Sequence, residues 1–345
     1  MIKNKRIKPS LVFLMILVTC VMLTKNKANA EEQDPLGFTY ENVHPKNQIS
    51  DRDYFELKVN PGDKQTLVTK VTNNSDKAKT IQVTVSDATT SSTGVINYGA
   101  SKEKLIGEEP LAISEMIEAP TQIKVKPGET EEIKFKLTVP RAKFDGLVLG
   151  GIRLKEITKE STEPIKDGAS LQNEYSYIYS ISIKENDKKI EPEITSSGAK
   201  YSQKAYVSIN NVRPMIASKV KAETLLMGED SDKVLKEFKV SDYRIAPNST
   251  LALPLEGTDD LELGKYRTKT TVFIDDKKWD FENKFEVTKE NKEKKQDVLF
   301  EETPKEKTIN WLVIILIVVS FIATTAGIFF IISKSQKKKK TPDKK

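Results

Sequence analysis

The stretch VNPGDKQTLVTKV, residues 59–71, contains a tight turn followed directly by a strand. Proline presets the backbone angle at the first turn position, and glycine supplies the positive φ at the next. In the strand, Leu67, Thr69 and Val71 share one face because successive side chains point to opposite sides. This period of two predicts a half-buried strand that packs against a second sheet.

The same pattern recurs along the chain. Residues 125–139 read VKPGETEEIKFKLTV, and a weaker copy begins at Pro247. Alternating apolar residues predict further strands at residues 55–59, 81–85, 205–209, 251–255 and 266–274. One short helical stretch is expected at 113–118. Short strands with turns about every ten residues predict an all-β fold of two immunoglobulin-like β-sandwich domains.

Both ends of the chain carry features of export and anchoring. Residues 1–30 are basic, then apolar, then small, and end in Ala28-Asn29-Ala30, which predicts a cleaved signal peptide; an uncleaved anchor is the alternative. Residues 309–332 form a charge-free apolar run that is long enough for one transmembrane helix. The lysine-rich tail, residues 333–345, is expected in the cytoplasm, which places the ectodomain outside a single-pass cell-membrane protein.

Composition divides the exported part of the chain. We expect the first sandwich at residues 31–158, a linker poor in apolar residues at 159–171, and the second sandwich at 172–288. Residues 289–308 are rich in lysine and glutamate and are expected to form a charged stalk. Within the second domain, Leu261 to Tyr266 is similar to a corner in which a tyrosine hydroxyl binds nearby backbone.

Composition also excludes several classes of function. The single cysteine, Cys20, lies in the signal peptide, and the single histidine, His44, excludes a zinc site with two histidine ligands. A Ser-His-Asp triad would have to use His44 itself. Thirteen of the 56 basic residues but one of the 50 acidic residues lie in the signal peptide and tail, so the ectodomain is mildly acidic and does not suit nucleic acid. We predict a protein that is not an enzyme and needs no cofactor or metal.

Short motifs carry a family resemblance. They are NQI at 47–49, YFELKV at 54–59, PG at 61–62, NNS at 73–75, ATT at 88–90, GVI at 94–96, Tyr98, PGE at 127–129, VP at 139–140 and FDGLVLGGI at 144–152. With these motifs the chain resembles the WxL-interacting proteins of Gram-positive bacteria. Residues 174–288 are similar to the second domain of that family, and the order of signal peptide, two domains, membrane helix and basic tail is the same.

The resemblance implies a function in binding. It implies that the first domain binds peptidoglycan and that the second binds WxL-domain surface proteins or host extracellular matrix proteins. The chain itself has no Trp-x-Leu motif, since the two tryptophans begin WDF at 279–281 and WLV at 311–313. The resemblance therefore implies an anchored receptor, and it supplies no catalytic residues.

Two groups of residues are candidate binding sites. The loop from 87 to 99 carries hydroxyl and amide groups suited to sugar or peptide, and the peptidoglycan candidates are Thr89, Thr90, Asn97 and Tyr98. An ordinary hairpin with Tyr98 in the core is the alternative. The partner-binding candidates alternate on one strand and are Tyr175, Tyr177 and Tyr179. If they face inward they belong to the core, as the parity of Ile181 and Ile183 favours.

Two other functions stay open. One is a chaperone-like sandwich that binds an exposed strand of its partner by edge addition. The other is a wall-active hydrolase that uses a pair of carboxylates, although no particular pair stands out in the sequence.

Overall fold

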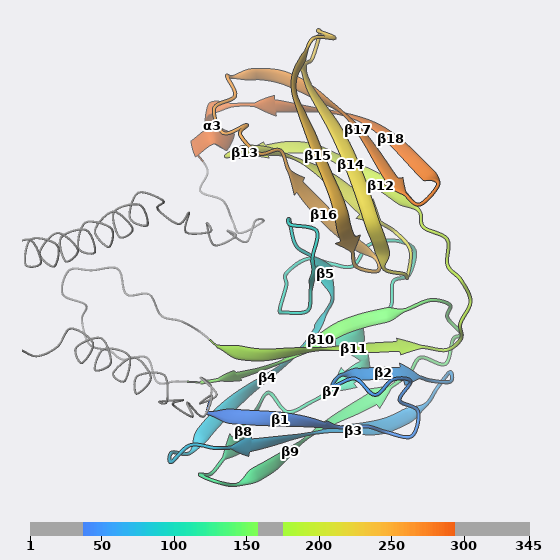
Figure 1. Ribbon diagram of the computed structural model, residues 1–345, viewed down its shortest axis with the longest axis vertical. Helices are drawn as coiled ribbons and strands as arrows, with labels where there is room; N and C mark the ends of the chain where they lie inside the picture. The colour runs from blue at the N-terminus through green and yellow to red at the C-terminus, as the bar shows by residue number, and fades with distance from the viewer. Residues whose placement is uncertain (1–36, 158–174, 294–345) are drawn as a thin grey trace, which may run out of the picture. The chain divides into compact units, whose positions relative to one another are not determined.

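The computed structural model describes residues 37–157 and 175–293, and the regular secondary structure there consists almost entirely of strands (Figure 1). The predicted all-β class is thereby confirmed. The expected signal peptide, linker, transmembrane helix and tail, and most of the stalk, lie outside these residues. In the described part of the chain, no helix has the length and apolar character needed to cross a membrane.

The first sandwich has two sheets. In the order of their pairing, one contains β1 (Phe38–Val43), β3 (Lys64–Asn73), β9 (Thr130–Thr138) and β7 (Ile117–Glu118). The other contains β2 (Phe55–Lys58), β11 (Ser176–Lys184), β10 (Val148–Glu156), β4 (Lys79–Asp87) and β8 (Gln122–Val125). The core lies between them, and Phe38, Phe55 and Phe135 are among its largest fully buried side chains.

The strand faces that were predicted to be buried from the alternating pattern do lie in this core. Leu67, Thr69 and Val71 are all buried, and the neighbouring strand β9 of the same sheet alternates strictly from Ile133 onward. The turns before β3 and β9 contain Gly62 and Gly128 with φ of 78° and 69°, which is the left-handed conformation that glycine adopts readily. The helix expected at 113–118 is present as α2 (Ile113–Met116), but residues 117–118 pair with β9 as strand β7.

The second sandwich also has two sheets. One contains β12 (Ile194–Ser202), β13 (Lys204–Asn211) and β16 (Ser249–Pro254); the other contains β15 (Val234–Ile245), β14 (Ala217–Gly228), β17 (Gly264–Ile274) and β18 (Lys277–Val287). Its core is a separate apolar cluster. The hydroxyl of Tyr266 donates to the carbonyl of Glu262 at 3.1 Å, which is the expected tyrosine corner. A short helix, α3 (Lys289–Glu293), follows β18.

Strand β11 lies in the first sandwich, whereas the expected division placed it at the start of the second domain. It pairs antiparallel with β10 and parallel with β2, and so fills the position between them. Ile181 and Ile183 are fully buried in the first core, and the second core begins at Ile194. Periodicity reveals a strand but not its partner, and the apolar-poor segment before β11 suggested a boundary that the sheet pairing does not follow.

Candidate functional site

The hairpin of β5 (Thr89–Thr90) and β6 (Ile96–Asn97) carries the four peptidoglycan candidates and contacts the second sandwich. Thr90 is only 5% exposed, and its Oγ1 lies 2.9 Å from Ser249 Oγ and accepts a hydrogen bond from the amide of Ala246 at 3.0 Å. Thr89 is buried as well. The two threonine hydroxyls are therefore enclosed where the sandwiches meet.

The other two hairpin candidates also serve the local structure. Asn97 Oδ1 accepts a hydrogen bond from the amide of Gly99 at 2.8 Å and so closes its own turn. Tyr98 is half-buried and runs over Gly151, where a Cβ atom would lie 2.0 Å from the carbonyl oxygen of Tyr98. Desolvation by burial raises the pKa of Tyr98. The four residues lie on one hairpin, but they do not present a group of exposed hydroxyls.

The tyrosines before and within β11 divide into one exposed residue and two that face the first core. Tyr175 is 51% exposed and precedes the strand. Tyr179 is 5% exposed, stacks on Tyr40 at 4.8 Å between ring centroids, and shares a 2.8 Å hydrogen bond with Thr69 Oγ1. Tyr177 makes edge contacts with Phe38 and Tyr40. Of the two orientations considered, the inward one describes Tyr177 and Tyr179.

The contact between the sandwiches has little free space, as two glycines show. Gly94, with φ of 72°, lies against the ring of Tyr243, and a Cβ atom there would be 2.1 Å from Cγ of that ring. Gly146, with φ of 88°, lies against Pro214, and a Cβ atom would be 2.3 Å from its carbonyl oxygen. Backbone hydrogen bonds of 2.8 Å run from the amide of Arg244 to Gly94 and from the amide of Leu147 to Pro214.

A small apolar cluster accompanies these backbone contacts. It consists of Ala88, Ile96, Leu149 and Ala246, with Tyr98, Leu147 and Ile216 packed around it. Asn248 adds hydrogen bonds of 2.8 Å in both directions, since its carbonyl accepts from the amide of Ile106 and its side chain donates to the carbonyl of Ile106. Apolar burial and satisfied backbone groups together hold this contact in one arrangement.

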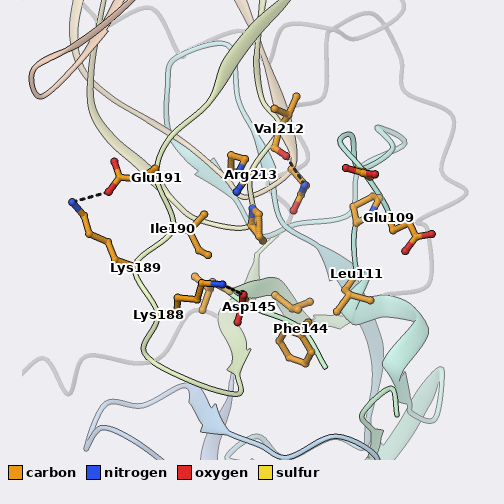
Figure 2. A pocket seen from close by; sticks show the side chains of 16 residues that line it. Glu109, Leu111, Phe144, Asp145, Lys188, Lys189, Ile190, Glu191, Val212 and Arg213 are labelled. Atoms are coloured by element: carbon orange, nitrogen blue, oxygen red, sulfur yellow. Dashed lines mark hydrogen bonds and ion pairs between the residues drawn. The ribbon is translucent and has the colours of Figure 1, made fainter. Parts of the chain in front are cut away.

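Beside this contact lies a cleft of about 610 Å³ (Figure 2). We call it the interdomain cleft, and three parts of the chain line it. The first sandwich contributes residues 108–111, 144–145 and 147–148; the segment after β11 contributes 188–191; the second sandwich contributes 212–214 and Asn248. A cleft of this size accommodates a small ligand or part of a chain.

Some of the charges in the cleft are satisfied by the protein itself. Asp145 accepts a hydrogen bond from Asn186 at 3.1 Å and forms an ion pair with Lys188, drawn dashed in Figure 2. These hydrogen bonds, with that of Lys188 first, hold the pKa of Asp145 below its usual value. Glu191 is likewise paired, with Lys277 at 2.8 Å and Lys189 at 3.1 Å, and its pKa is lowered by the same two lysines.

Other charges remain available. Arg213 has one ion-pair partner in the described chain, Glu193, at the long distance of 3.7 Å. Glu108 and Glu109 are exposed and form no ion pair with any described residue. In residues 37–157 and 175–293, no three His, Cys, Asp or Glu side chains are grouped as a metal site would require. The interdomain cleft is thus suited to holding a polar ligand that carries charge of both signs.

No local pattern in the sequence indicates this cleft. Its unpaired charges come from loops about a hundred residues apart, and each loop taken alone has the composition of an ordinary turn. Only the packing of one sandwich on the other brings them together.

Two β-sandwiches packed through a hairpin, with a polar cleft beside the contact, suit a binding protein, but the fold alone does not set the function. Sequence comparison agrees, since the model of the "WxL Interacting Protein, peptidoglycan binding domain" matches residues 38–156. The model of the "WxL Interacting Protein, host binding domain" matches residues 166–296 and so includes β11, although β11 pairs within the first sandwich. The chain belongs to the WxL Interacting Protein family, as its motifs predicted.

Comparison with solved structures gives distant likenesses. The YadV chaperone has 11% identity and a TM-score of 0.30 over 73% of this chain and 100% of its own. The chaperone DraB of E. coli has 15% identity and a TM-score of 0.27 over 72% of this chain and 98% of its own. TM-scores this low carry no argument about function. No curated protein matches the chain significantly.

Proposed function

We propose that this chain is a membrane-anchored binding protein of the Gram-positive cell surface. Its first sandwich binds peptidoglycan, and its second binds WxL-domain surface proteins or host extracellular matrix proteins. The observation that carries the proposal is the match of two binding-domain models of one family across residues 38–296. The mildly acidic ectodomain agrees with specific binding better than with general attraction to polyanions.

Co-sedimentation with purified peptidoglycan tests the first half of the proposal. The full chain in detergent is expected to sediment with insoluble wall material and to remain in the supernatant without it. Heat-unfolded chain is the control for nonspecific adsorption. Failure of the folded protein to sediment above this control would contradict the wall-binding role.

Affinity capture tests the second half. The full chain on beads is expected to retain a WxL-domain protein from a wall extract of the same cells, identified by mass spectrometry. A purified extracellular matrix protein tests the host ligand separately. Retention of neither would leave the second sandwich without the proposed role.

The membrane location rests on the residues at both ends. The apolar run 309–332 and the lysines after it favour one spanning helix with the ectodomain outside. Protease added to wall-stripped cells is expected to digest residues 37–293 and to spare the lysine-rich tail. An ectodomain that stays protected until the membrane is permeabilised would overturn this topology.

Strand addition is a second candidate for partner binding, and it has one supporting observation. β15 is the outer strand of its sheet, spans 12 residues, and has Val234 and Leu235 exposed. An outer strand offers unpaired backbone groups to a partner strand. Proline substitutions along residues 234–240 would abolish partner capture in this case, whereas changes of exposed side chains alone would not.

A further inference from the structure

We propose that the interdomain cleft binds a short peptide that has a free amine and a free carboxylate, as the uncross-linked stem peptides of peptidoglycan do. This inference rests on the proposed wall-binding function and assigns a ligand chemistry and a place to it. It follows from the charges of both signs that two neighbouring loops bring to the cleft and from the apolar residues that line it.

One side of the cleft is anionic. Glu108 and Glu109 lie at the end of the loop that leads from the hairpin to α2, and Figure 2 shows Glu109 at the rim above Leu111. Glu109 has φ of 47°, a left-handed conformation that costs a non-glycine residue free energy. Two adjacent carboxylates without a described cation favour an ammonium group of the ligand.

The neighbouring loop of the second sandwich supplies a cation, Arg213. Arg213 keeps most of its five N–H donors free, because its pair with Glu193 is long and its side chain is 44% exposed. The loop that carries it is held by Asn211, which is fully buried and donates to the carbonyls of Met215 at 2.7 Å and Ala246 at 2.9 Å. The carbonyl of Asn211's side chain accepts from the amide of Arg213 at 3.2 Å. The backbone of Arg213 is therefore held, and a guanidinium with free donors binds a carboxylate through two parallel hydrogen bonds.

The surface between the charges favours peptide over glycan. Proteins commonly bind sugar rings on an exposed aromatic face, but Phe144 is the one aromatic residue among the described lining of this cleft, and it packs against the first core. Leu111 and Ile190 offer aliphatic surface of the size that suits the methyl groups of alanine side chains. The cleft therefore matches the peptide part of the wall polymer.

Because both sandwiches contribute walls, a bound peptide contacts both of them. The ligand would then stabilise the contact between the sandwiches, since it binds only when the two walls are in place. This predicts a ligand-dependent rise in the unfolding temperature of the full chain.

Isothermal titration calorimetry with the full chain in detergent tests the inference. The probe is a synthetic pentapeptide with one lysine side-chain amine and a free C-terminal carboxylate. The first comparison probe is the same peptide with blocked amines and an amidated C-terminus. The second is a glycan fragment without peptide. Arg213→Gln and the double change Glu108→Gln/Glu109→Gln are each expected to weaken binding about tenfold or more. The matched controls are Lys134→Gln and Glu131→Gln/Glu132→Gln on the exposed face of β9, which should bind like wild type.

The outcomes separate this inference from the proposed function. Unchanged affinity in the cleft variants, or equal loss in the β9 controls, would overturn the cleft as the site. Tighter binding of the glycan fragment than of the free peptide would overturn the ligand class while leaving wall binding in place. Peptide binding that depends on Arg213, in a chain that does not sediment with intact peptidoglycan, would support the cleft and contradict the proposed wall attachment.

Discussion

Removing β11 is expected to unfold the first sandwich, even though the peptidoglycan-binding family model ends at residue 156. The strand places Tyr179, Ile181 and Ile183 in the core. Burial of each such side chain stabilises a fold by about 1.5–3 kcal/mol, so the three contribute about 5–9 kcal/mol. A whole domain is stable by only about 5–15 kcal/mol. Loss of this one strand therefore removes most or all of the stability of the sandwich, before its hydrogen bonds to two neighbours are considered.

The test compares two fragments, residues 31–157 and residues 31–190. The longer fragment includes β11 and the ion pairs of Asp187 with Lys58 and Lys184. Circular dichroism and urea unfolding are expected to show a cooperative β-sheet transition for residues 31–190 and none for residues 31–157. A third fragment, residues 31–190 with Ile181→Ser and Ile183→Ser, keeps the length but not the buried side chains, and should behave like the short one. If residues 31–157 unfold cooperatively with a free energy within about 1 kcal/mol of the longer fragment, the assignment of β11 to the first core is refuted.

Three further predictions concern changes of single residues. Burial raises the pKa of Tyr179, so the hydroxyl loses its proton at a lower pH in the unfolded chain than in the folded one. The free energy of unfolding of the first sandwich should therefore fall as the pH rises above about 10. Urea titrations at several pH values measure this decline, and Tyr179→Phe should make it less steep. Gly94→Ala should loosen the contact between the sandwiches, seen as faster hydrogen exchange at residues 244–249, whereas Gly128→Ala, which has a similar φ but open space around it, should leave exchange there unchanged. Tyr266→Phe should lower the free energy of unfolding of the second sandwich by about 1 kcal/mol, because the hydrogen bond to Glu262 is lost. The fluorescence of Trp279 reports the unfolding transition of this sandwich. An unchanged transition would mean that the corner does not stabilise the fold.

Local patterns in the sequence were enough to predict most elements. The alternation in 133–139 and 205–209 and the Pro-Gly turns depend on residues within one element and occur as expected, and the short helix occurs over the first four of its six expected residues. The corner at Tyr266 was also predictable because both partners of its hydrogen bond lie within five residues. Local backbone structure could be predicted because it depends on residues that are close together in the sequence.

Long-range pairing was not predictable in the same way. The strand pattern of residues 176–184 is equally good for either sandwich, and its pairing with β2 joins residues more than 120 positions apart. Thr90 lies in a loop whose composition is typical of ligand binding. Its hydroxyl instead forms hydrogen bonds with Ser249 and Ala246, because the second sandwich lies against this loop. Hydroxyl-rich hairpins serve ligands and neighbouring domains through the same hydrogen bonds, and residue type alone does not separate the two.

The position of β11 between β2 and β10 also determines when the first sandwich is completed during synthesis. The chain emerges from its N-terminus, so both neighbours are made before the strand that joins them. Synthesis of the stretch from the end of β10 to the end of β11 takes on the order of a few seconds. For that time the unfinished sheet has a gap with two unpaired edges, each able to pair with another nascent chain. Pairing of β11 with β2 and β10 is therefore the step that closes these two edges to other chains.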